Sequence, residues 1–177
     1  MLPLPADVRA FERLFRDNYG SLCRFATRFV DDPSRAEELV QSVFTTLWVN
    51  RATWAVEHSE RAYLFAAVRN AALNDRKHAR VRREWEAAEA RAEVADQRTD
   101  PSQPDELMER EETAQRVRGA IAALPERCRM VMDLRWRDQM SYAEIAEAMG
   151  ISVKGVESQL ARGLQRLRAI LGSRFDE

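Results

Sequence analysis

The apolar residues of the chain recur every three or four positions, which is the spacing of one buried helix face. Over Ala6–Val30 such a stripe predicts a first helix, with the apolar residues Val8, Phe11, Phe15, Leu22, Phe25 and Phe29. A second stripe over Pro33–Asn50 predicts another helix, with the apolar residues Ala36, Val40, Val43 and Leu47. Asp32 can cap this second helix, and the fixed φ of Pro33 suits its first position.

A third helix is predicted from Glu60 to beyond Arg83, after an expected loop over 51–59. Its apolar side consists of Leu64, Ala67, Val68 and Ala71. Past residue 84 the apolar stripe disappears, and the stretch around Pro101 and Pro104 is rich in residues that break helices. We therefore predict an N-terminal helical domain over 1–83, a linker over 84–106 and a C-terminal domain over 107–177.

The C-terminal domain is expected to contain four short helices, over 107–123, 126–137, 141–149 and 153–171. Ser141 and Glu144 have the spacing of a capping box, and Gly150 ends the third helix before Ser152 caps the fourth. The residues expected to point inward are Ile145, Ala146, Met149, Val156, Leu160, Leu164 and Leu167. Two short helices joined in this way predict a helix–turn–helix, whose second helix enters the DNA major groove. An ordinary helical hairpin is the alternative.

The predicted fold is all-α, with two small helical domains joined by an acidic linker and a helix–turn–helix in the second domain. The composition agrees, because only six glycines and six prolines occur in 177 residues. No apolar run is long enough to span a bilayer, and the N-terminus lacks the pattern of a secretory signal, so a cytoplasmic protein is expected. Cys23 and Cys128 stand far apart without partners at metal-ligand spacing, which favours reduced structural residues over a redox switch.

The charge is unevenly distributed, although the whole chain carries only −1. Residues 1–83 carry a net +4, residues 84–112 a net −8 and residues 113–177 a net +3. The two basic blocks suit a polyanionic partner, whereas the acidic connector between them would be repelled by DNA.

Two polar faces are candidates for contact with nucleic acid. On the last helix the outward residues are Lys154, Glu157, Ser158, Ala161, Arg162, Gln165 and Arg166. Arginine and lysine side chains can address guanine or phosphate, and glutamine can address adenine. On the third helix the polar residues are Arg69, Asn70, Asn74, Arg76, Lys77, Arg80 and Arg83. Basic residues near the aromatic Trp54, Tyr63 and Phe65 have the chemistry of single-strand binding, although a solvated basic face is the alternative.

These motifs, in this order, resemble the extracytoplasmic-function (ECF) family of RNA polymerase sigma factors over nearly the whole chain. The segment Ala36–Phe44, followed by Leu47 and Trp48, resembles the polymerase-binding helix of the family. Tyr63–Asn74 resembles its promoter-melting helix. The segment Leu124–Arg129 and the helix that contains Glu144, Ile145 and Ala146 resemble its C-terminal domain.

The resemblance implies a subunit that brings core RNA polymerase to selected promoters and has no catalytic site, cofactor or metal of its own. It implies contact with the polymerase β′ clamp helices through Glu38, Gln41, Phe44 and Trp48. For Phe44 and Trp48 a role in the core of the domain is the alternative. It also implies that the C-terminal domain binds the β flap, that the acidic linker enters the nucleic-acid path of the polymerase, and that a separate anti-sigma factor controls the protein.

The resemblance further divides the polar residues between two promoter elements. The melted −10 strand would meet Trp54, Asn70, Asn74, Arg76, Lys77, Arg80 and Arg83. Among these, Asn70 matches a position that contacts the strand, and Trp54 matches a position in the loop that receives a flipped base. The −35 duplex would meet the outward residues of the last helix, from Lys154 to Arg166.

The start of the last helix departs from the commonest pattern of the family. Gly155-Val156-Glu157-Ser158-Gln159 stands where many members have Thr-Val-Lys/Arg-Ser-Arg. A glutamate in place of a basic residue should weaken the attraction to phosphate, and it could accept a hydrogen bond from cytosine. This stretch resembles the iron-uptake-type branch of the family.

Two other classes of function compete with this interpretation. A stand-alone transcription regulator would use the same helix–turn–helix, but it leaves the motifs of the N-terminal helices unexplained. A nucleic-acid enzyme would need clustered carboxylates or an activated nucleophile. His58 and His78 have no partners at ligand spacing, and the acidic residues concentrate in the linker, which disfavours an enzyme.

Overall fold

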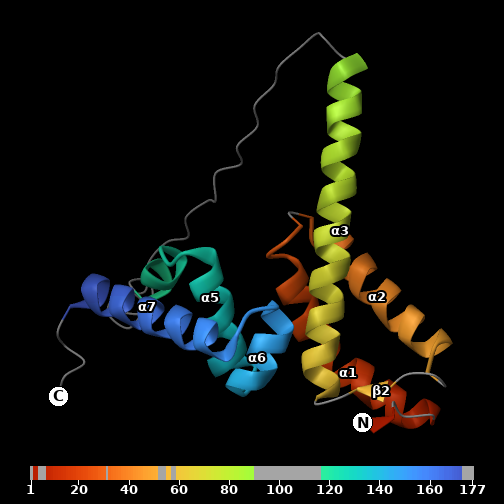
Figure 1. Ribbon diagram of the computed structural model, residues 1–177, viewed down its shortest axis with the longest axis horizontal. Coiled ribbons are helices and arrows are strands. Elements are labelled where there is room, and N and C mark those ends of the chain that lie inside the picture. The colour runs from red at the N-terminus through yellow and green to blue at the C-terminus, as the bar shows by residue number, and fades with distance from the viewer. Residues whose placement is uncertain are drawn as a thin grey trace, which may run out of the picture.

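The computed structural model describes residues 2–3, 7–30, 32–51, 55–56, 59–89 and 117–172, with only the backbone described over 2–3, 55–56 and 81–89. The predicted all-α class is confirmed for this part of the chain. Figure 1 shows two groups of helices, with the long helix α3 standing between them. The one departure is a pair of two-residue antiparallel strands, β1 (Leu2–Pro3) and β2 (Ala55–Val56), the second of which falls in the expected loop.

The N-terminal group consists of α1 (Val8–Ala26), α2 (Pro33–Val49) and α3 (Glu60–Glu89). The side chain of Asp32 accepts a hydrogen bond from the backbone N–H of Ser34, and Pro33 begins α2, as predicted. α1 ends four residues before its predicted end. Hydrogen bonds from the N–H of Arg28 and Phe29 to carbonyls three residues earlier tighten the chain into a turn there.

The C-terminal group consists of a helical segment over 117–122, α5 (Glu126–Met132), the π-helix η1 (Asp133–Arg137), α6 (Tyr142–Met149) and α7 (Val153–Leu171). The chain is helical over 126–137, as predicted, but its last turn is a π-helix. There the N–H of Asp138 bonds to the carbonyl of Asp133 at 3.1 Å, which is the wider spacing of a π-helix.

The capping signals of the helix–turn–helix are confirmed. The hydroxyl of Ser141 accepts from the N–H of Glu144, and the carboxylate of Glu144 accepts from the N–H of Ser141 at 2.8 Å. Gly150 ends α6 with a φ of 62°, a left-handed conformation that glycine adopts without strain. Ser152 accepts from the N–H of Gly155 at 3.1 Å and caps α7.

The apolar stripes line one continuous core, with two exceptions. Val8 is 63% exposed at the start of α1, although it was predicted to be buried. On α7 the prediction of a buried Leu164 was also wrong, since that side chain is 40% exposed and Gly163 is buried instead. Gly163 brings α7 against α5 so closely that a Cβ atom would lie 2.6 Å from the sulfur of Met132. Val156 and Leu160 are buried as predicted, and Leu167 is half-buried.

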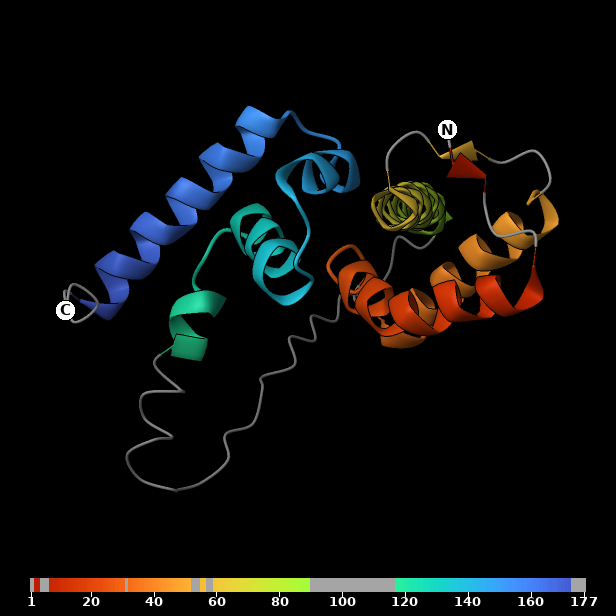
Figure 2. The same ribbon diagram turned by 90° about the horizontal axis from the view of Figure 1, so that it is seen from below.

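The two groups of helices pack against each other through α3 and α6. Seen from below in Figure 2, α3 lies between α6 on one side and α1 and α2 on the other. Most of the buried apolar residues of both groups belong to one cluster, in which Met130, Val131 and Leu134 join Leu22 and Phe25. The helix that carries the candidate single-strand residues is therefore in contact with the first helix of the helix–turn–helix.

Candidate nucleic-acid interface

The outer face of α7 presents every residue that the sequence predicted for it. Its exposed residues include Lys154, Glu157, Ser158, Ala161, Arg162, Gln165 and Arg166. On the opposite side, Val156 is 0% and Leu160 is 5% exposed, so the helix has one buried and one open face. The open face carries the basic groups Lys154, Arg162 and Arg166 with the carboxylate of Glu157 among them. Such a face can address phosphates, guanines and a cytosine amino group.

The short helix α6 fixes how α7 is presented, and Glu144 is the residue that anchors its start. Burial alone would raise the pKa of Glu144. Hydrogen bonds from the N–H of Ser141 and from the hydroxyls of Ser59 and Ser141, with the nearby Arg61 guanidinium, outweigh this and hold the pKa below its usual range. The carboxylate is therefore ionised at neutral pH, and the negative charge suits a helix N-terminus.

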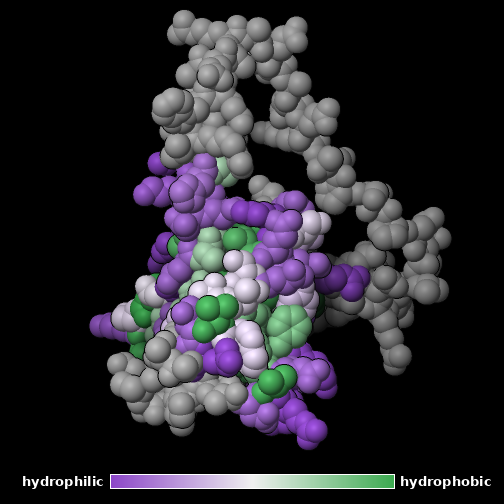
Figure 3. Space-filling view, turned by 90° about the vertical axis from the view of Figure 1, so that its right-hand side faces the viewer, coloured by the Kyte–Doolittle hydropathy of each residue, from purple (hydrophilic) through white to green (hydrophobic). Residues whose placement is uncertain are grey.

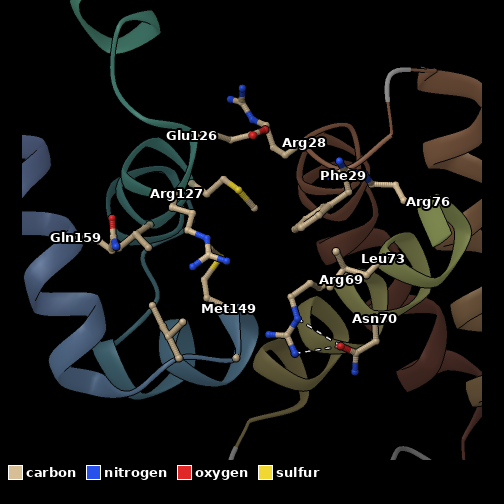
Figure 4. A pocket seen from close by; sticks show the side chains of 14 residues that line it. Arg28, Phe29, Arg69, Asn70, Leu73, Arg76, Glu126, Arg127, Met149 and Gln159 are labelled. Atoms are coloured by element: carbon tan, nitrogen blue, oxygen red, sulfur yellow. Dashed lines mark hydrogen bonds between the residues drawn. The ribbon is translucent and has the colours of Figure 1, made fainter. Parts of the chain in front are cut away.

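Asn70 lies on the polar side of α3, where it is held by its neighbour Arg69. The side-chain oxygen of Asn70 accepts from Arg69 Nε at 3.3 Å and from Nη2 at 3.0 Å, as the dashed lines in Figure 4 mark. Arg69 Nη1 also donates to the carbonyl of Ala148 at 2.6 Å and to that of Glu147 at 3.2 Å, at the end of α6. Burial lowers the pKa of Arg69, but the guanidinium remains a cation.

The remaining candidates on α3 are exposed where the structure describes them. Asn74, Arg76, Lys77 and Arg80 have exposed side chains. Arg83 lies on α3 with an undescribed side chain, and Trp54 lies outside the described residues. Asp75 faces α2 and pairs with Arg35, which also bonds to Glu38 at 2.7 Å. Hydrogen bonds to Asp75 and Glu38 raise the pKa of Arg35, so α2 and α3 are joined by charge as well as by packing.

On α2 the polymerase-binding candidates separate into exposed and buried residues. Glu38 and Gln41 are exposed, and Gln41 Nε2 donates to the hydroxyl of Tyr19 at 3.3 Å. Phe44 is only 3% exposed and packs edge-on against Phe15, with ring centroids 4.8 Å apart, which favours its core role over direct contact with a partner.

Trp48 is half-buried and lies one turn after Phe44 on α2. Its ring lies 5.0 Å from that of Phe11, and the guanidinium of Arg51 covers it at 4.1 Å. The N-terminal side of the molecule, which faces the viewer in Figure 3, is mostly hydrophilic, and apolar residues reach it only in small separate patches. Any partner of this side would therefore meet mainly polar groups.

A cavity of about 390 Å³ lies between the two groups of helices. Figure 4 shows Asn70, Leu73 and Arg76 on the α3 side, with Arg127 and Met149 on the opposite side. Polar contacts also join the two groups of helices. The sequence analysis missed the residues that make them, chiefly Arg28, Arg61, Asp133 and Asp138, because each pairs with a residue 77 or more positions away. No local pattern marks such a pair.

The described residues contain no cluster of His, Cys, Asp and Glu side chains that could hold a metal ion, and no helix among them is long and apolar enough to cross a bilayer. Cys128 is buried, and its thiol donates to Gln159 Oε1 at 3.1 Å. Burial raises the pKa of Cys23, which disfavours the reactive thiolate. Both cysteines are therefore packed as structural residues.

Two family models match the chain, and they fall on its two groups of helices. The model "Sigma-70 region 2" matches residues 14–85, and the model "Sigma-70, region 4" matches residues 114–167. The first match contains most of α1 to α3. The second contains the helix–turn–helix.

Curated relatives match nearly the whole chain. The RNA polymerase sigma-E factor of Streptomyces coelicolor is 31% identical over 168 residues, which are 95% of this chain and 89% of that protein. The ECF RNA polymerase sigma factor SigK of Mycolicibacterium vanbaalenii is 25% identical over 171 residues, which are 94% of this chain and 84% of that protein.

Solved structures share the fold. The sigma factor RpoE in complex with the anti-sigma factor NepR, from Bartonella quintana, superposes with a TM-score of 0.61 at 22% identity and covers 93% of this chain and 98% of that one. CnrH in complex with the cytosolic domain of CnrY superposes with a TM-score of 0.58 at 26% identity and covers 96% of this chain and 92% of that one.

Proposed function

Because this chain belongs to the extracytoplasmic-function family of RNA polymerase sigma factors, we propose that it binds core RNA polymerase and directs initiation at promoters read through a −10 and a −35 element. The observation that carries this is the pairing, in one chain, of a helix–turn–helix with an open polar face and a separate polar helix, α3. A stand-alone regulator would need only the first of these.

The −35 element is read in this proposal by α7. Its open face, from Lys154 to Arg166, would lie in the major groove, with Lys154, Glu157 and Ser158 nearest the base edges because they belong to its first turns. Arg162 and Arg166 lie further along the helix and would serve phosphates as much as bases. The same C-terminal domain would bind the β flap of the polymerase.

The −10 element is read by α3 as a melted strand. Asn70 would contact a base, and Asn74, Arg76, Lys77, Arg80 and Arg83 would follow the backbone. Trp54, in the segment before α3, would form part of a pocket for a flipped base. The pairing of exposed amides with a basic helix supports this assignment.

Core polymerase would dock on α2 through its β′ clamp helices. Glu38 and Gln41 are the exposed residues for this contact, and Trp48 would contribute the edge of its ring. Phe44, buried behind them, would hold α2 in place. The domain limits follow as proposals: 1–83 for polymerase and −10 binding, 84–106 for the acidic linker in the nucleic-acid path, and 107–177 for −35 binding.

Regulation by a separate anti-sigma factor is also proposed. One protein that shares the fold, the sigma factor RpoE, was solved with such a partner, the anti-sigma factor NepR, and CnrH was solved with the cytosolic domain of CnrY. The protein would act in the cytoplasm and would have no catalytic activity, since the polymerase performs the chemistry. The stretch Gly155–Gln159 supports a finer proposal, membership of the iron-uptake-type branch.

The test is transcription from genomic DNA by core RNA polymerase with and without this protein, followed by mapping of start sites. We expect specific starts only when the protein is present, with shared −10 and −35 sequences upstream. Tight, sequence-specific binding to the same duplexes by the protein alone, without new starts, would favour the stand-alone regulator.

A further inference from the structure

The cavity of about 390 Å³ beside α3 is lined by two chemically different kinds of side chain. One kind is apolar and consists of Phe29, Leu73, Met130, Val131, Met149 and Ile151. The other kind is cationic and consists of Arg28, Arg69, Arg76 and Arg127. A single carboxylate, that of Glu126, lies among them. The cavity therefore combines an apolar wall with an excess of positive charge.

Most of this positive charge is not balanced within the described part of the chain. Arg28 pairs with Asp133 at 3.1 Å. Arg69, Arg76 and Arg127 form no ion pair with any residue that the structure describes. Three guanidinium groups around one small space repel each other, and an anion placed among them would relieve that repulsion.

Arg69 is fixed at the edge of the cavity by neutral oxygen atoms. Its Nη1 donates to the carbonyl of Ala148 at 2.6 Å, and its Nη2 donates to the side-chain oxygen of Asn70 at 3.0 Å. Gly150 makes room for the guanidinium, since a Cβ atom at that position would lie 2.7 Å from Nη1. Arg69 is also partly buried, so its charge is less screened by water than that of an exposed arginine. It thus offers an anion a cation that is already held in place.

Arg127 provides the second cation, from the opposite wall. In Figure 4 its guanidinium and that of Arg69 extend from the two sides into the space between α3 and the C-terminal group. Arg127 is exposed, so little packing opposes its movement onto a ligand. A guanidinium group binds a carboxylate, sulfonate or phosphate through two parallel hydrogen bonds. Two such groups on facing walls suit one anionic group between them.

The apolar wall requires more of a ligand than a charge. Leu73 is 46% exposed and Met149 is half-buried, so both keep apolar surface open toward the cavity. An inorganic ion would leave that surface in water, whereas a ring system would cover it. A wholly apolar molecule would instead remove water from the guanidinium groups without replacing its hydrogen bonds. The volume falls in the range of about 300–1,000 Å³ that is typical of small-molecule sites.

We propose that this cavity is a binding site for a small organic anion with an aromatic or other apolar body. The charged group would lie between Arg69 and Arg127, and the apolar body would lie on Leu73 and Met149. The site goes beyond the proposed function, because no contact with polymerase or promoter requires a small molecule. Such a ligand would contact α3, α5 and α6 together.

Two fluorescent dyes test the site in the full-length chain. 8-Anilinonaphthalene-1-sulfonate and N-phenyl-1-naphthylamine share one ring system and differ in the sulfonate, and each becomes fluorescent when it leaves water. We expect the sulfonate dye to saturate at one molecule per chain. It should bind about tenfold more tightly than the neutral dye, because hydrogen bonds between ionised groups are the strong ones.

Variants of the two walls should affect the dyes differently. Arg127→Gln should weaken the sulfonate dye about tenfold and leave the neutral dye nearly unchanged, whereas Arg127→Lys should retain most of the affinity. Arg9→Gln removes the same charge from the exposed start of α1 and is the control. Leu73→Asn should weaken both dyes about fivefold, because each loses apolar contact. Ile170→Asn is its control, since Ile170 is 47% exposed and lies on α7 outside the cavity.

Four results would overturn the proposal. Unchanged binding of the sulfonate dye in both Arg127→Gln and Leu73→Asn would place the dye elsewhere, and an equal loss in Arg9→Gln would reduce the effect to net charge. Equal affinity for the neutral dye would show that the charge is not recognised. Displacement of the sulfonate dye by sodium sulfate as readily as by naphthalene-2-sulfonate would show that the apolar body is not recognised.

Thermal melts followed by circular dichroism check that each variant is folded, because the sulfonate dye also binds partly unfolded chains. If Leu73→Asn lowers the stability, Leu73→Ala takes its place. These measurements contain neither polymerase nor DNA. A failure to direct transcription would therefore count against the proposed function alone, and a failure to bind the dye would count against this site alone.

Discussion

Gly163 of α7 lies so close to Met132, the last residue of α5, that a Cβ atom at position 163 would come within 2.6 Å of the methionine sulfur. Non-bonded heavy atoms prefer separations of about 3.5–4.0 Å. The contact therefore depends on the absence of a side chain. It sets the separation of α5 and α7 in the C-terminal group of helices.

We expect Gly163→Ala to lower the free energy of unfolding by about 1 kcal/mol, because overpacking costs about 1–3 kcal/mol and the gain in helix propensity returns up to about 1 kcal/mol. Gly119→Ala is the matched control. Gly119 is helical and has no atom within 4 Å of an added Cβ, so this change should stabilise by about 0.4–1 kcal/mol. Urea unfolding of both variants measures the difference, and equal stabilisation by the two changes would contradict the packing argument.

Substitutions of Phe44 and Gln41 should affect different properties. The first should lower the stability of the chain, and the second should weaken its binding to core polymerase. Phe44→Ala opens a cavity among the rings of α1 and α2 and should cost about 3–5 kcal/mol of stability. Gln41→Ala, on the exposed side of the same helix, should leave the melting temperature nearly unchanged and weaken binding to core polymerase severalfold. Thermal melts measure the stability of both variants, and fluorescence-detected binding measures their affinity for core polymerase. Loss of polymerase affinity in a folded Phe44→Leu variant, with none in Gln41→Ala, would reverse the assignment.

Asn70→Ala should impair promoter opening while leaving the affinity for core polymerase intact, because the amide is proposed to contact the melted strand. Trp54→Ala should act in the same way by removing a stacking surface worth about 1–3 kcal/mol. Permanganate footprints of unpaired thymines measure opening on a promoter found by start-site mapping. Normal footprints in both variants would show that α3 does not contact the melted −10 strand.

Glu157 distinguishes base reading from simple charge repulsion. Because a carboxylate gains nothing from phosphate, we expect it to read a base, and Glu157→Ala should relax the preference at one −35 position by about 1–3 kcal/mol. Selection from a library with a randomised −35 element, performed with the polymerase holoenzyme, measures the preference. Glu12→Ala makes the same change of charge on α1 and is the control. A uniform gain in affinity for all sequences, with an unchanged preference, would mean that Glu157 only repels the backbone.

Glu144 should make the stability depend on pH. Its pKa is lowered in the folded chain, so folding favours the ionised carboxylate. This contribution is complete above the ordinary glutamate pKa of about 4.3 and is lost as the pH falls through the lower folded-state value.

The comparison with Glu144→Gln measures that contribution. The variant should be less stable than the wild type by about 0.5–2 kcal/mol at neutral pH, the range for a helix cap. The difference should narrow as the pH is lowered through the folded-state pKa of Glu144, below which the wild-type carboxyl is also neutral. Glu37→Gln, on the exposed side of α2, is the control. A difference between Glu144→Gln and wild type that stays constant over this pH range would show that the charge of Glu144 contributes nothing.

Local signals in the sequence predicted the helices and their caps well. Ser141 and Glu144 act within one turn of each other and Gly150 ends the same short helix, so their spacing carries the whole signal. The exposed face of α7 follows from helical periodicity in the same way. The burial of Leu164 was predicted wrongly because helical periodicity does not show how closely two helices approach. The close contact at Gly163 depends on Met132, which is 31 residues earlier in the chain.

The contacts between the two groups of helices could not be predicted for a related reason. Arg28 and Asp133 are separated by 105 residues, and both look like ordinary surface charges in their own helices. Arg69 was assigned to the polar side of α3 correctly, but its partner at Ala148 is a backbone carbonyl, which has no signature in a sequence. A single sequence reports local structure far better than the pairing of distant charges.

The π-turn over Asp133–Arg137 holds one residue more than an α-helical turn would need, and the chain reaches Asp138 from it. Removal of one residue from this turn would rotate everything after it by about 100° relative to α5. We expect such a deletion to swing the Asp138 carboxylate away from Arg61 and to displace α6 and α7, which follow the turn, from their packing on α3 and α5. The length of this turn thus sets the rotational phase of the helix–turn–helix relative to α5, and a chain one residue shorter there would present α7 in another direction.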